Sequence, residues 1–92
     1  MKFIENNTYT LQTDYYNSVK VVCTYVEDNT VWFRSFYPVH QVIGDDHYKL
    51  NRKTNKLYML NSKFSSWDSV ENTLSEDPLG NTVEGFEKVS YD

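Results

Sequence analysis

The feature that most constrains the fold is a predicted β-hairpin over residues 18–37. Its two halves, 19–27 and 30–37, are rich in β-branched and aromatic side chains, which are enriched in strands. Asp28 and Asn29 lie between the halves and are common turn residues, so the sequence predicts a two-residue turn. Both faces of this hairpin carry apolar side chains. We therefore expect a central hairpin that is covered on both sides, or that is covered on one side and meets a partner on the other.

The predicted turn sets a register that sorts the hairpin side chains into two faces. From the turn outward it pairs Val26 with Val31, Tyr25 with Trp32, Thr24 with Phe33, Cys23 with Arg34 and Val21 with Phe36. One face is expected to hold Val22, Thr24, Val26, Val31, Phe33 and Tyr37. The other is expected to hold Val19, Val21, Cys23, Tyr25, Trp32, Arg34 and Phe36. A slip of one residue in either strand would mix the two sets.

A second hairpin is predicted from residues 47–52 and 56–61, with the turn at 53–55. Apolar and polar side chains alternate along both halves, which is typical of strands with one buried face. The face expected to point inward holds Tyr48, Leu50, Leu57 and Met59. The opposite face is expected to hold Lys49, Asn51 and Tyr58.

Other segments complete the expected sheet. Residues 8–13 predict a first strand and residues 83–91 a last one. Pro38 lacks the N–H of a ladder bond, so it should interrupt the first hairpin. Residues 39–43 then form a short strand or an extended connection that ends at Gly44.

One helix is predicted at about residues 65–75. Ser65 suits an N-cap, and Asp68 follows three residues later, as in a capping box. A short apolar stripe recurs at helical spacing and consists of Trp67, Val70 and Leu74.

These elements predict an α+β fold that is mainly β, in a single domain over residues 1–92. We expect a curved antiparallel sheet or a small barrel of five or six strands, with the short helix before the last strand. The strand pattern of residues 7–11, 19–26 and 31–36 resembles the opening of SH3-like small barrels. This resemblance covers about half of the chain and implies an SH3-like barrel.

Charge is unevenly placed along the chain. The formal net charge is −4, yet residues 45–63 carry five basic and two acidic groups, whereas residues 64–92 carry one basic and seven acidic groups. Affinity for phosphates comes from accumulated Lys and Arg, so the overall acidity argues against non-specific DNA binding. The acidic third is expected to meet a basic surface on a partner, or simply to keep a small protein in solution.

The cysteine count and the hydropathy pattern indicate where the chain works. Cys23 is the lone cysteine, so no internal disulfide can form and a reducing compartment is expected. No apolar run approaches the roughly 20 residues of a membrane span, and residues 1–10 lack the apolar block of a signal peptide. We expect a cytoplasmic protein without membrane contact.

No catalytic or metal-binding pattern is recognised in the sequence. Cys23 lies in mid-strand without a neighbouring histidine or helix end to lower its pKa, so a structural role is expected. His40 and the run Asp45, Asp46 and His47 are potential metal ligands, but they lack the spacing of known zinc sites. We therefore expect no enzymatic activity, no metal ion and no cofactor.

Side chains of the first hairpin form the candidate surface for protein contact, the aromatic patch, which consists of Tyr25, Trp32, Arg34 and Phe36. Trp, Tyr and Arg are the types most enriched in interface hot spots, and a large exposed apolar patch commonly serves binding. The alternative is that the predicted helix covers this face. In that case the opposite face, or the pair Tyr15 and Tyr16, becomes the candidate.

The second hairpin offers a candidate surface for nucleic acid, the basic set, which consists of Tyr48, Lys49, Arg52, Lys53, Lys56 and Tyr58. Basic groups interleaved with aromatic rings are typical of sites that stack the bases of a single strand. The alternative is a solvated hairpin end whose charges prevent edge-to-edge pairing.

Alanine is absent from the chain, and asparagine, lysine and tyrosine are frequent, with asparagines at Asn6, Asn7, Asn51, Asn55 and Asn61. This composition resembles that of the small accessory proteins of bacteriophages and mobile elements. Many proteins of that class inhibit host defence, CRISPR systems included, or host polymerases. The resemblance implies a non-enzymatic protein-binding module that inhibits a basic, nucleic-acid-binding host protein in the bacterial cytoplasm.

This leading hypothesis gives contact roles to carboxylates and rings. The aromatic patch would supply a buried anchor, while a partner's basic groove would receive Asp68, Glu71, Glu76, Asp77, Glu84 and Glu87. The runner-up is a small-barrel nucleic-acid-binding protein that uses the basic set. A third hypothesis is a structural subunit of a viral assembly, which would form a homo-oligomer.

Overall fold

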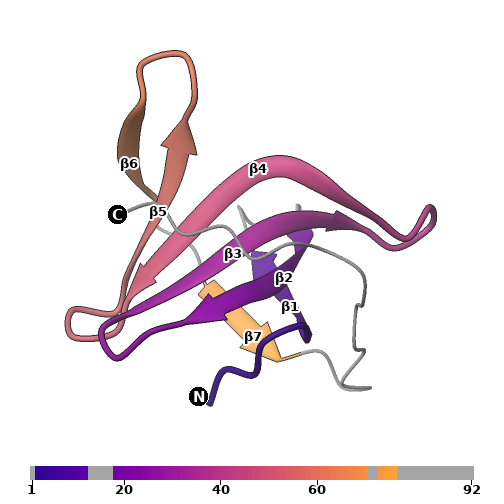
Figure 1. The fold of residues 1–92 in the computed structure, drawn as a ribbon, viewed down its shortest axis with the longest axis horizontal. Helices are drawn as coiled ribbons and strands as arrows, with labels where there is room; N and C mark the ends of the chain where they lie inside the picture. Colours follow the sequence, from indigo (N-terminus) through magenta and orange to yellow (C-terminus); the bar gives the residue numbers. More distant parts are fainter. Residues whose placement is uncertain (1, 13–17, 71–72, 77–92) are drawn as a thin grey trace.

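The computed structural model describes residues 2–12, 18–70 and 73–76. They form one antiparallel sheet of seven strands in the order β6-β5-β4-β3-β2-β1-β7 (Figure 1). The strands are β1 (Thr8–Gln12), β2 (Ser18–Val26), β3 (Thr30–Tyr37), β4 (Val42–Asn51), β5 (Lys56–Asn61), β6 (Ser66–Val70) and β7 (Thr73–Glu76). The described residues contain no helix, and hence none that is long and apolar enough to cross a membrane.

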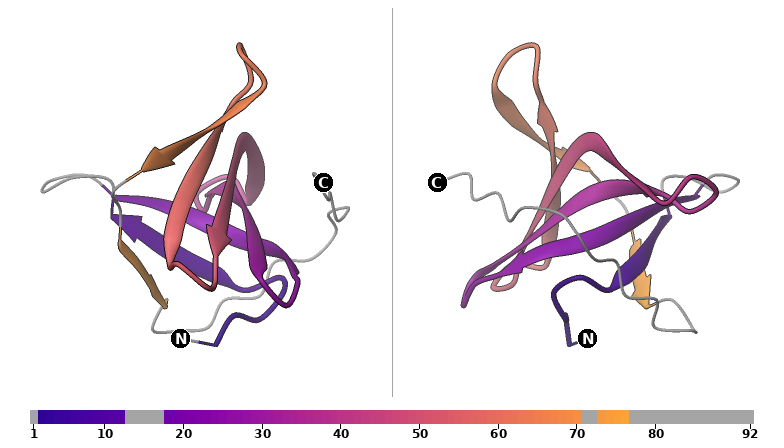
Figure 2. Two further views of the ribbon diagram at one scale, coloured as in Figure 1. Left: turned by 90° about the vertical axis from the view of Figure 1, so that its left-hand side faces the viewer. Right: turned by 45° about the vertical axis from the view of Figure 1, so that its right-hand side comes forward.

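The sheet is strongly curved, as Figure 2 shows from two sides. β6 and β7 form its opposite edges, yet only two residues separate Val70 from Thr73 in the chain. Three Cα steps span at most about 11 Å, so the two edges must come close together. No ladder joins β6 to β7 within the described part of the chain, and the sheet remains open. The predicted curved, mainly β sheet is confirmed, whereas the closed SH3-like barrel and the count of five or six strands are wrong.

The core fills the inner side of the curve. Its centre is a group of three rings, Phe3, Tyr9 and Phe33, whose centroids lie 5.4 to 5.9 Å apart in tilted and edge-on contacts. The Tyr9 hydroxyl accepts the Ile4 N–H at 2.8 Å, which satisfies a polar atom at the edge of the core. Around the rings pack buried side chains from five strands, namely Leu11, Val21, Cys23, Val31, Tyr48, Leu50 and Leu57.

A β-bulge corrects the predicted register of the first hairpin. The pairs Val26–Val31 and Tyr25–Trp32 are as predicted, but Thr24 has no paired residue on β3 and Cys23 lies opposite Phe33. A bulge inserts one residue into one strand, so the three predicted pairs farther from the turn are wrong. The two predicted faces are therefore mixed. Val21 and Cys23 point into the core beside Val31 and Phe33, and a second, outer cluster consists of Val22, Phe36 and Ile43.

β4 runs without a break through Gly44, so the prediction of a segment that ends there is wrong. The chain turns at residues 38–41 instead, where Gln41 has a φ of 54°. Gly44 is buried against β3, and a Cβ at this position would meet the Ser35 Oγ and lie 2.7 Å from the Tyr37 ring. A glycine at position 44 therefore lets β3 and β4 approach closely.

The pairing and the inward face of the second hairpin, β4–β5, are as predicted, although β4 begins at Val42 instead of residue 47 and ends at Asn51. Tyr48 pairs with Met59 and Leu50 with Leu57, and all four belong to the core or pack against it. The turn is held by Asn51, whose Oδ1 accepts the backbone N–H groups of Lys53 and Thr54 at 2.9 and 3.2 Å. Asn55 completes the turn with a φ of 59°.

The predicted helix at about 65–75 is wrong, because this segment forms β6 and β7. Ser65 has a φ of 53°, which is unlike the extended backbone of an N-cap, and it lies in the turn before β6. The apolar residues find partners across the sheet instead of along a helix, since Val70 pairs with Leu57, Trp67 with Leu60 and Leu74 with Leu11. The predicted strand at 83–91 lies outside the described residues.

Candidate binding site

Three neighbouring strands place a row of side chains on the outer face of the sheet. Each of these strands points side chains into the core, namely Val31 and Phe33 from β3, Tyr48 and Leu50 from β4, and Leu57 from β5. Side chains alternate along a strand, so the residues between or beside them point outward. The row across β3, β4 and β5 consists of Trp32, Lys49 and Tyr58, which are paired in register.

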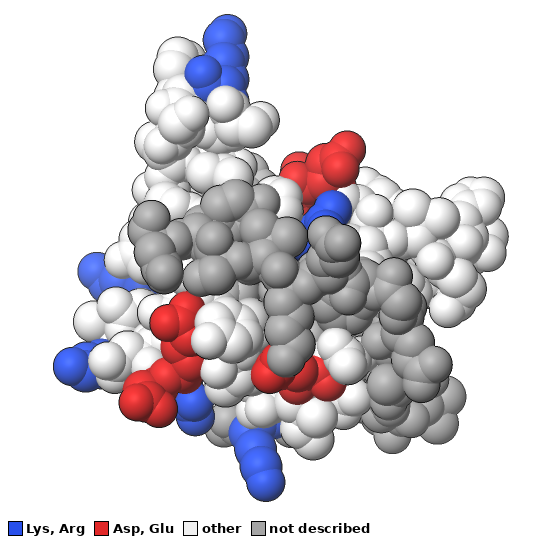
Figure 3. Space-filling view, in the orientation of Figure 1, with Lys and Arg blue, Asp and Glu red and all other residues white. Residues whose placement is uncertain are grey.

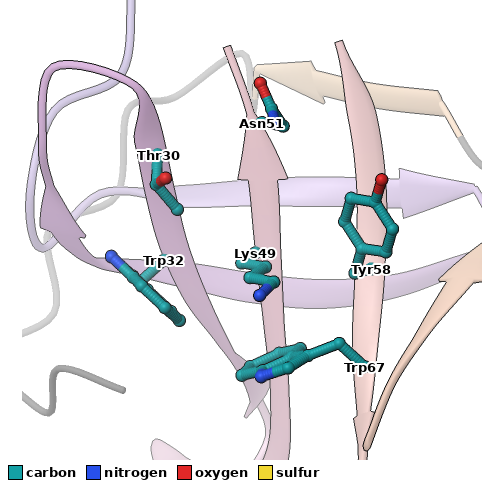
Figure 4. Close-up of a pocket in the computed structure, with 6 residues that line it drawn as sticks. All are labelled: Thr30, Trp32, Lys49, Asn51, Tyr58 and Trp67. Atoms are coloured by element: carbon teal, nitrogen blue, oxygen red, sulfur yellow. The ribbon is translucent and has the colours of Figure 1, made fainter. Parts of the chain in front are cut away.

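A hollow of about 360 Å³ lies over this row. We call it the Lys49 hollow, and it is lined by Thr30, Trp32, Lys49, Asn51, Tyr58 and Trp67 (Figure 4). Trp67 enters it from β6, which adds to the edge of β5 through the pairs Tyr58–Ser69 and Leu60–Trp67. The four strands β3 to β6 therefore build the site together.

Lys49 lies between the aromatic rings of the hollow. Its Nζ is 4.4 Å from the ring centroid of Trp67 and 5.8 Å from those of Trp32 and Tyr58. The two indole rings also meet edge to face, with centroids 5.7 Å apart. A cation this close to a ring face is attracted by the ring quadrupole, so the rings hold the ammonium group in the middle of the hollow.

Hydrogen bonds orient two other groups that line the hollow. The Trp32 indole N–H donates to the Glu27 Oε1 at 2.6 Å, which fixes the ring on β3. Asn51 uses its Oδ1 for the β4–β5 turn, as described above, so its amide NH₂ is the end that remains for the hollow. Both residues are thus positioned before any ligand arrives.

Further basic side chains lie at the β4–β5 end of the hollow. Lys56 is exposed and pairs with Asn51, which places it on the same outer face as Lys49. Arg52 and Lys53 are exposed in the adjoining turn. Acidic groups of the nearby β2–β3 turn accompany them, and Figure 3 shows basic and acidic side chains side by side at this end of the molecule.

The structure separates the members of the basic set. Lys49 and Tyr58 line the hollow, while Arg52, Lys53 and Lys56 lie beside it. Tyr48 is instead a core residue, and burial raises the pKa of its hydroxyl above the ordinary value. Its predicted place beside a nucleic acid is therefore wrong, as its inward position in the second hairpin already indicated.

The aromatic patch does not form one exposed surface. Trp32 and Phe36 are each only 6% exposed, and Phe36 packs in the outer cluster with Val22 and Ile43. Arg34 donates from its Nε and Nη2 to the Gly44 carbonyl at 3.1 and 2.9 Å. Tyr25 is half-buried opposite Trp32. Of the four predicted residues, Trp32 alone lines the hollow.

Most of the predicted acidic contact residues lie outside the described part of the chain. Asp68 is exposed on β6, where the Asn61 side-chain NH₂ donates to its Oδ2 at 3.3 Å. Glu76 ends β7, and its side chain is not described. The residues outside the described ranges are Glu71, Asp77, Glu84 and Glu87, together with the alternative candidates Tyr15 and Tyr16.

Sequence reasoning missed Trp67, Asn51 and Thr30 as parts of one site. The helical spacing predicts Trp67 on a helix, whereas its position in the hollow depends on the pairing of β6 with β5, which no local pattern shows. Asn51 pairs with Thr30 across β4 and β3, and each lies two residues from a member of the row on its own strand, Lys49 and Trp32 respectively. That period-two spacing was the available signal.

The groups considered for catalysis or metal binding are dispersed. Burial raises the pKa of the Cys23 thiol to about 12, with a smaller contribution from the charge of Glu5. Burial, and then the nearby Arg34 guanidinium, lower the pKa of His47 below its usual range. His40 is exposed in the β3–β4 turn. No three potential metal ligands come together among the residues that the structure describes.

No protein-family model, curated protein or solved structure matches this chain. Function is therefore inferred from the Lys49 hollow and its surroundings.

Proposed function

We propose that the chain is a non-enzymatic binding module whose Lys49 hollow receives a single strand of nucleic acid. One observation carries the proposal: an ammonium group lies between three aromatic rings in an open hollow on the sheet face. Aromatic rings stack on bases, at roughly 1–3 kcal/mol per base, and basic groups pair with the phosphates. Such a combination is typical of proteins that hold single strands.

The size and the charge of the site support a single strand over a duplex. A hollow of about 360 Å³ is within the range of pockets for small ligands, so it can take a base only when that base leaves the stack. Residues 45–63 carry five basic and two acidic groups within a chain of net charge −4. Arg52, Lys53 and Lys56 can therefore meet phosphates beside the hollow while Lys49 acts inside it.

The salt dependence of binding tests this function. Fluorescence anisotropy of a labelled strand of about ten nucleotides should show saturable binding at 50 mM salt. If Arg52, Lys53 and Lys56 each meet one phosphate, affinity should fall roughly 20-fold between 50 and 200 mM salt, since each contact contributes about −0.7 to the logarithmic slope. Lys56→Gln should reduce the slope by about 0.7, whereas Lys2→Gln, at an exposed position outside the strands, should leave it unchanged. Absence of saturable binding at 50 mM salt contradicts the proposal.

A protein partner is the second candidate function. Apolar side chains are exposed around the β3–β4 turn, where Tyr37 is 51%, Val39 90% and Val42 50% accessible. Exposed apolar groups of this size commonly serve protein contact. On this hypothesis the chain inhibits a host defence or nucleic-acid-processing protein, and the acidic C-terminal third adds salt-sensitive contacts to a basic groove.

Two substitutions test the protein partner. Val39→Asp should abolish retention of a partner from a bacterial lysate on the immobilised chain, because it places a charge in the apolar contact. The double change Glu84→Lys and Glu87→Lys should weaken the retention of the partner and make the remaining retention less sensitive to salt. A partner that both variants retain as strongly as the wild type contradicts this second function, and a partner released by nuclease treatment supports the first.

A further inference from the structure

We infer that the Lys49 hollow selects bases that carry a carbonyl at C4 of a pyrimidine or C6 of a purine, namely thymine, uracil and guanine, over adenine, which carries an amino group at that position. The inference rests on the proposed single-strand function and specifies which strands that function serves. It follows from the hydrogen-bonding groups that surround the hollow, most of which can only donate.

Two side chains on β4, Lys49 and Asn51, illustrate this excess of donors. Lys49 offers an ammonium with three donors and no acceptor. Asn51 must turn its carbonyl oxygen toward the turn, because the backbone N–H groups of Lys53 and Thr54 at 2.9 and 3.2 Å can only donate. The remaining end of the Asn51 side chain is an NH₂ group, which is again a donor.

The aromatic groups add no obligatory acceptor. An indole N–H is donor-only, and that of Trp32 is already bound to Glu27 at 2.6 Å. The hydroxyls of Thr30 and Tyr58 can either donate or accept a hydrogen bond, so they do not discriminate between the bases. A ligand that fills this hollow must therefore bring acceptors, and an anionic or carbonyl-bearing one suits Lys49 best.

Adenine fits such a hollow poorly. Asparagine recognises adenine by using its oxygen and its nitrogen together, and the oxygen of Asn51 is occupied by the turn. The exocyclic amino group of adenine would also face the donors Lys49 and the Asn51 NH₂. A ring carbonyl accepts from the same donors, as the O6 of guanine does from lysine. We expect at least a fivefold preference, the lower end of what one matched contact gives.

The test uses strands of about eight positions in which a single base is flanked by abasic sites, because this design removes stacking between bases. Anisotropy competition should rank the thymine, uracil and guanine strands at least about fivefold tighter than the adenine strand. The inference is overturned if the adenine strand binds as tightly as the thymine strand. It is also overturned if no single base raises the affinity above that of a strand with abasic sites only. Failure of a fully based, mixed-sequence strand to bind overturns the proposed function instead.

Asn51→Asp supplies the matched variant. The new carboxylate keeps an oxygen for the turn amides, so the melting temperature should remain close to that of the wild type. It replaces one of the two donors in the hollow with an acceptor, so the thymine-to-adenine affinity ratio should fall below that of the wild type, while Lys49 still favours the carbonyl. The added negative charge lowers both affinities, and for this reason the ratio is the readout. A ratio that persists in Asn51→Asp contradicts the role of the Asn51 NH₂.

Discussion

Lys49→Met separates the structural role of the ammonium group from its role in binding. The Nζ lies 4.4 Å from the Trp67 ring centroid, and the other two rings, at 5.8 Å, are near the limit of the interaction. A partly exposed contact of this kind contributes about 0.5–1 kcal/mol. Methionine keeps an unbranched side chain in the hollow, so little packing is lost. Unfolding should therefore become easier by about 1 kcal/mol at most, a loss of up to ~8 °C in Tm.

Binding should respond far more strongly than stability. A hydrogen bond to a charged group contributes about 1.5–3 kcal/mol, so loss of the ammonium should weaken affinity for a single strand by roughly 12- to 150-fold. The salt slope should change little, because the lost contact is to a neutral base carbonyl, whereas the slope follows the number of contacts to phosphates. Anisotropy titrations at two salt concentrations measure the affinity and its salt slope. A thermal melt measures the loss of stability.

Lys63→Met is the matched control for this substitution. Lys63 also lies over a ring, with its Nζ 5.5 Å from the Phe64 centroid, but it is exposed in the β5–β6 turn, at the other end of β5 from the β4–β5 turn. This variant should bind within about twofold of the wild type, because it loses an equal charge outside the hollow. The reasoning is refuted if Lys49→Met binds a strand as tightly as the wild type, or if both variants lose affinity equally.

Three further predictions concern the fold. Gly44→Ala should destabilise the protein by about 1–3 kcal/mol, measured as a lower midpoint in urea, because the new Cβ lies 2.7 Å from the Tyr37 ring and against Ser35; an unchanged midpoint would show that β3 and β4 can move apart. The pKa of His47 is lowered from 6.5 in the folded state, so the unfolded chain binds its proton more readily. The stability due to neutral His47 is therefore complete above about pH 6.5 and is lost as the pH falls below it. The urea midpoint should fall more steeply with decreasing pH in the wild type than in His47→Gln. Equal slopes would contradict the burial of the imidazole. At pH 8 the thiolate fraction of Cys23 should be about one in ten thousand, given a pKa of about 12, so iodoacetamide should label it only in urea; rapid labelling of the native protein would contradict its burial.

The second hairpin could be predicted from the sequence because its physical signals agree. Tyr48, Leu50 and Leu57 alternate with polar residues, and a wrong register would expose them to water. The same alternation placed Lys49 and Tyr58 on the outer face. Two of the three side chains in the row across β3, β4 and β5 were therefore predictable from local pattern alone.

The first hairpin and the predicted helix show where local pattern fails. Both faces of residues 18–37 are apolar, so burial does not distinguish the register with a bulge at Thr24 from the one without it. Trp67, Val70 and Leu74 fit a helical stripe, but two of them complete the inner core from β6 and β7 while Trp67 covers Trp32 from outside. The segment forms strands because β6 pairs with β5 and β7 pairs with β1. The pairing of β7 with β1 joins residues far apart in the sequence, so a local pattern does not reveal it.

Tryptophan fluorescence tests the central claim most directly, because both tryptophans of the chain, Trp32 and Trp67, line the Lys49 hollow. A single strand that stacks in the hollow should change their emission in a saturable way, with the same midpoint as the anisotropy titration, and Lys49→Met should shift both midpoints together. Strand binding seen by anisotropy with no change in tryptophan emission would place the strand elsewhere on the molecule and contradict the account.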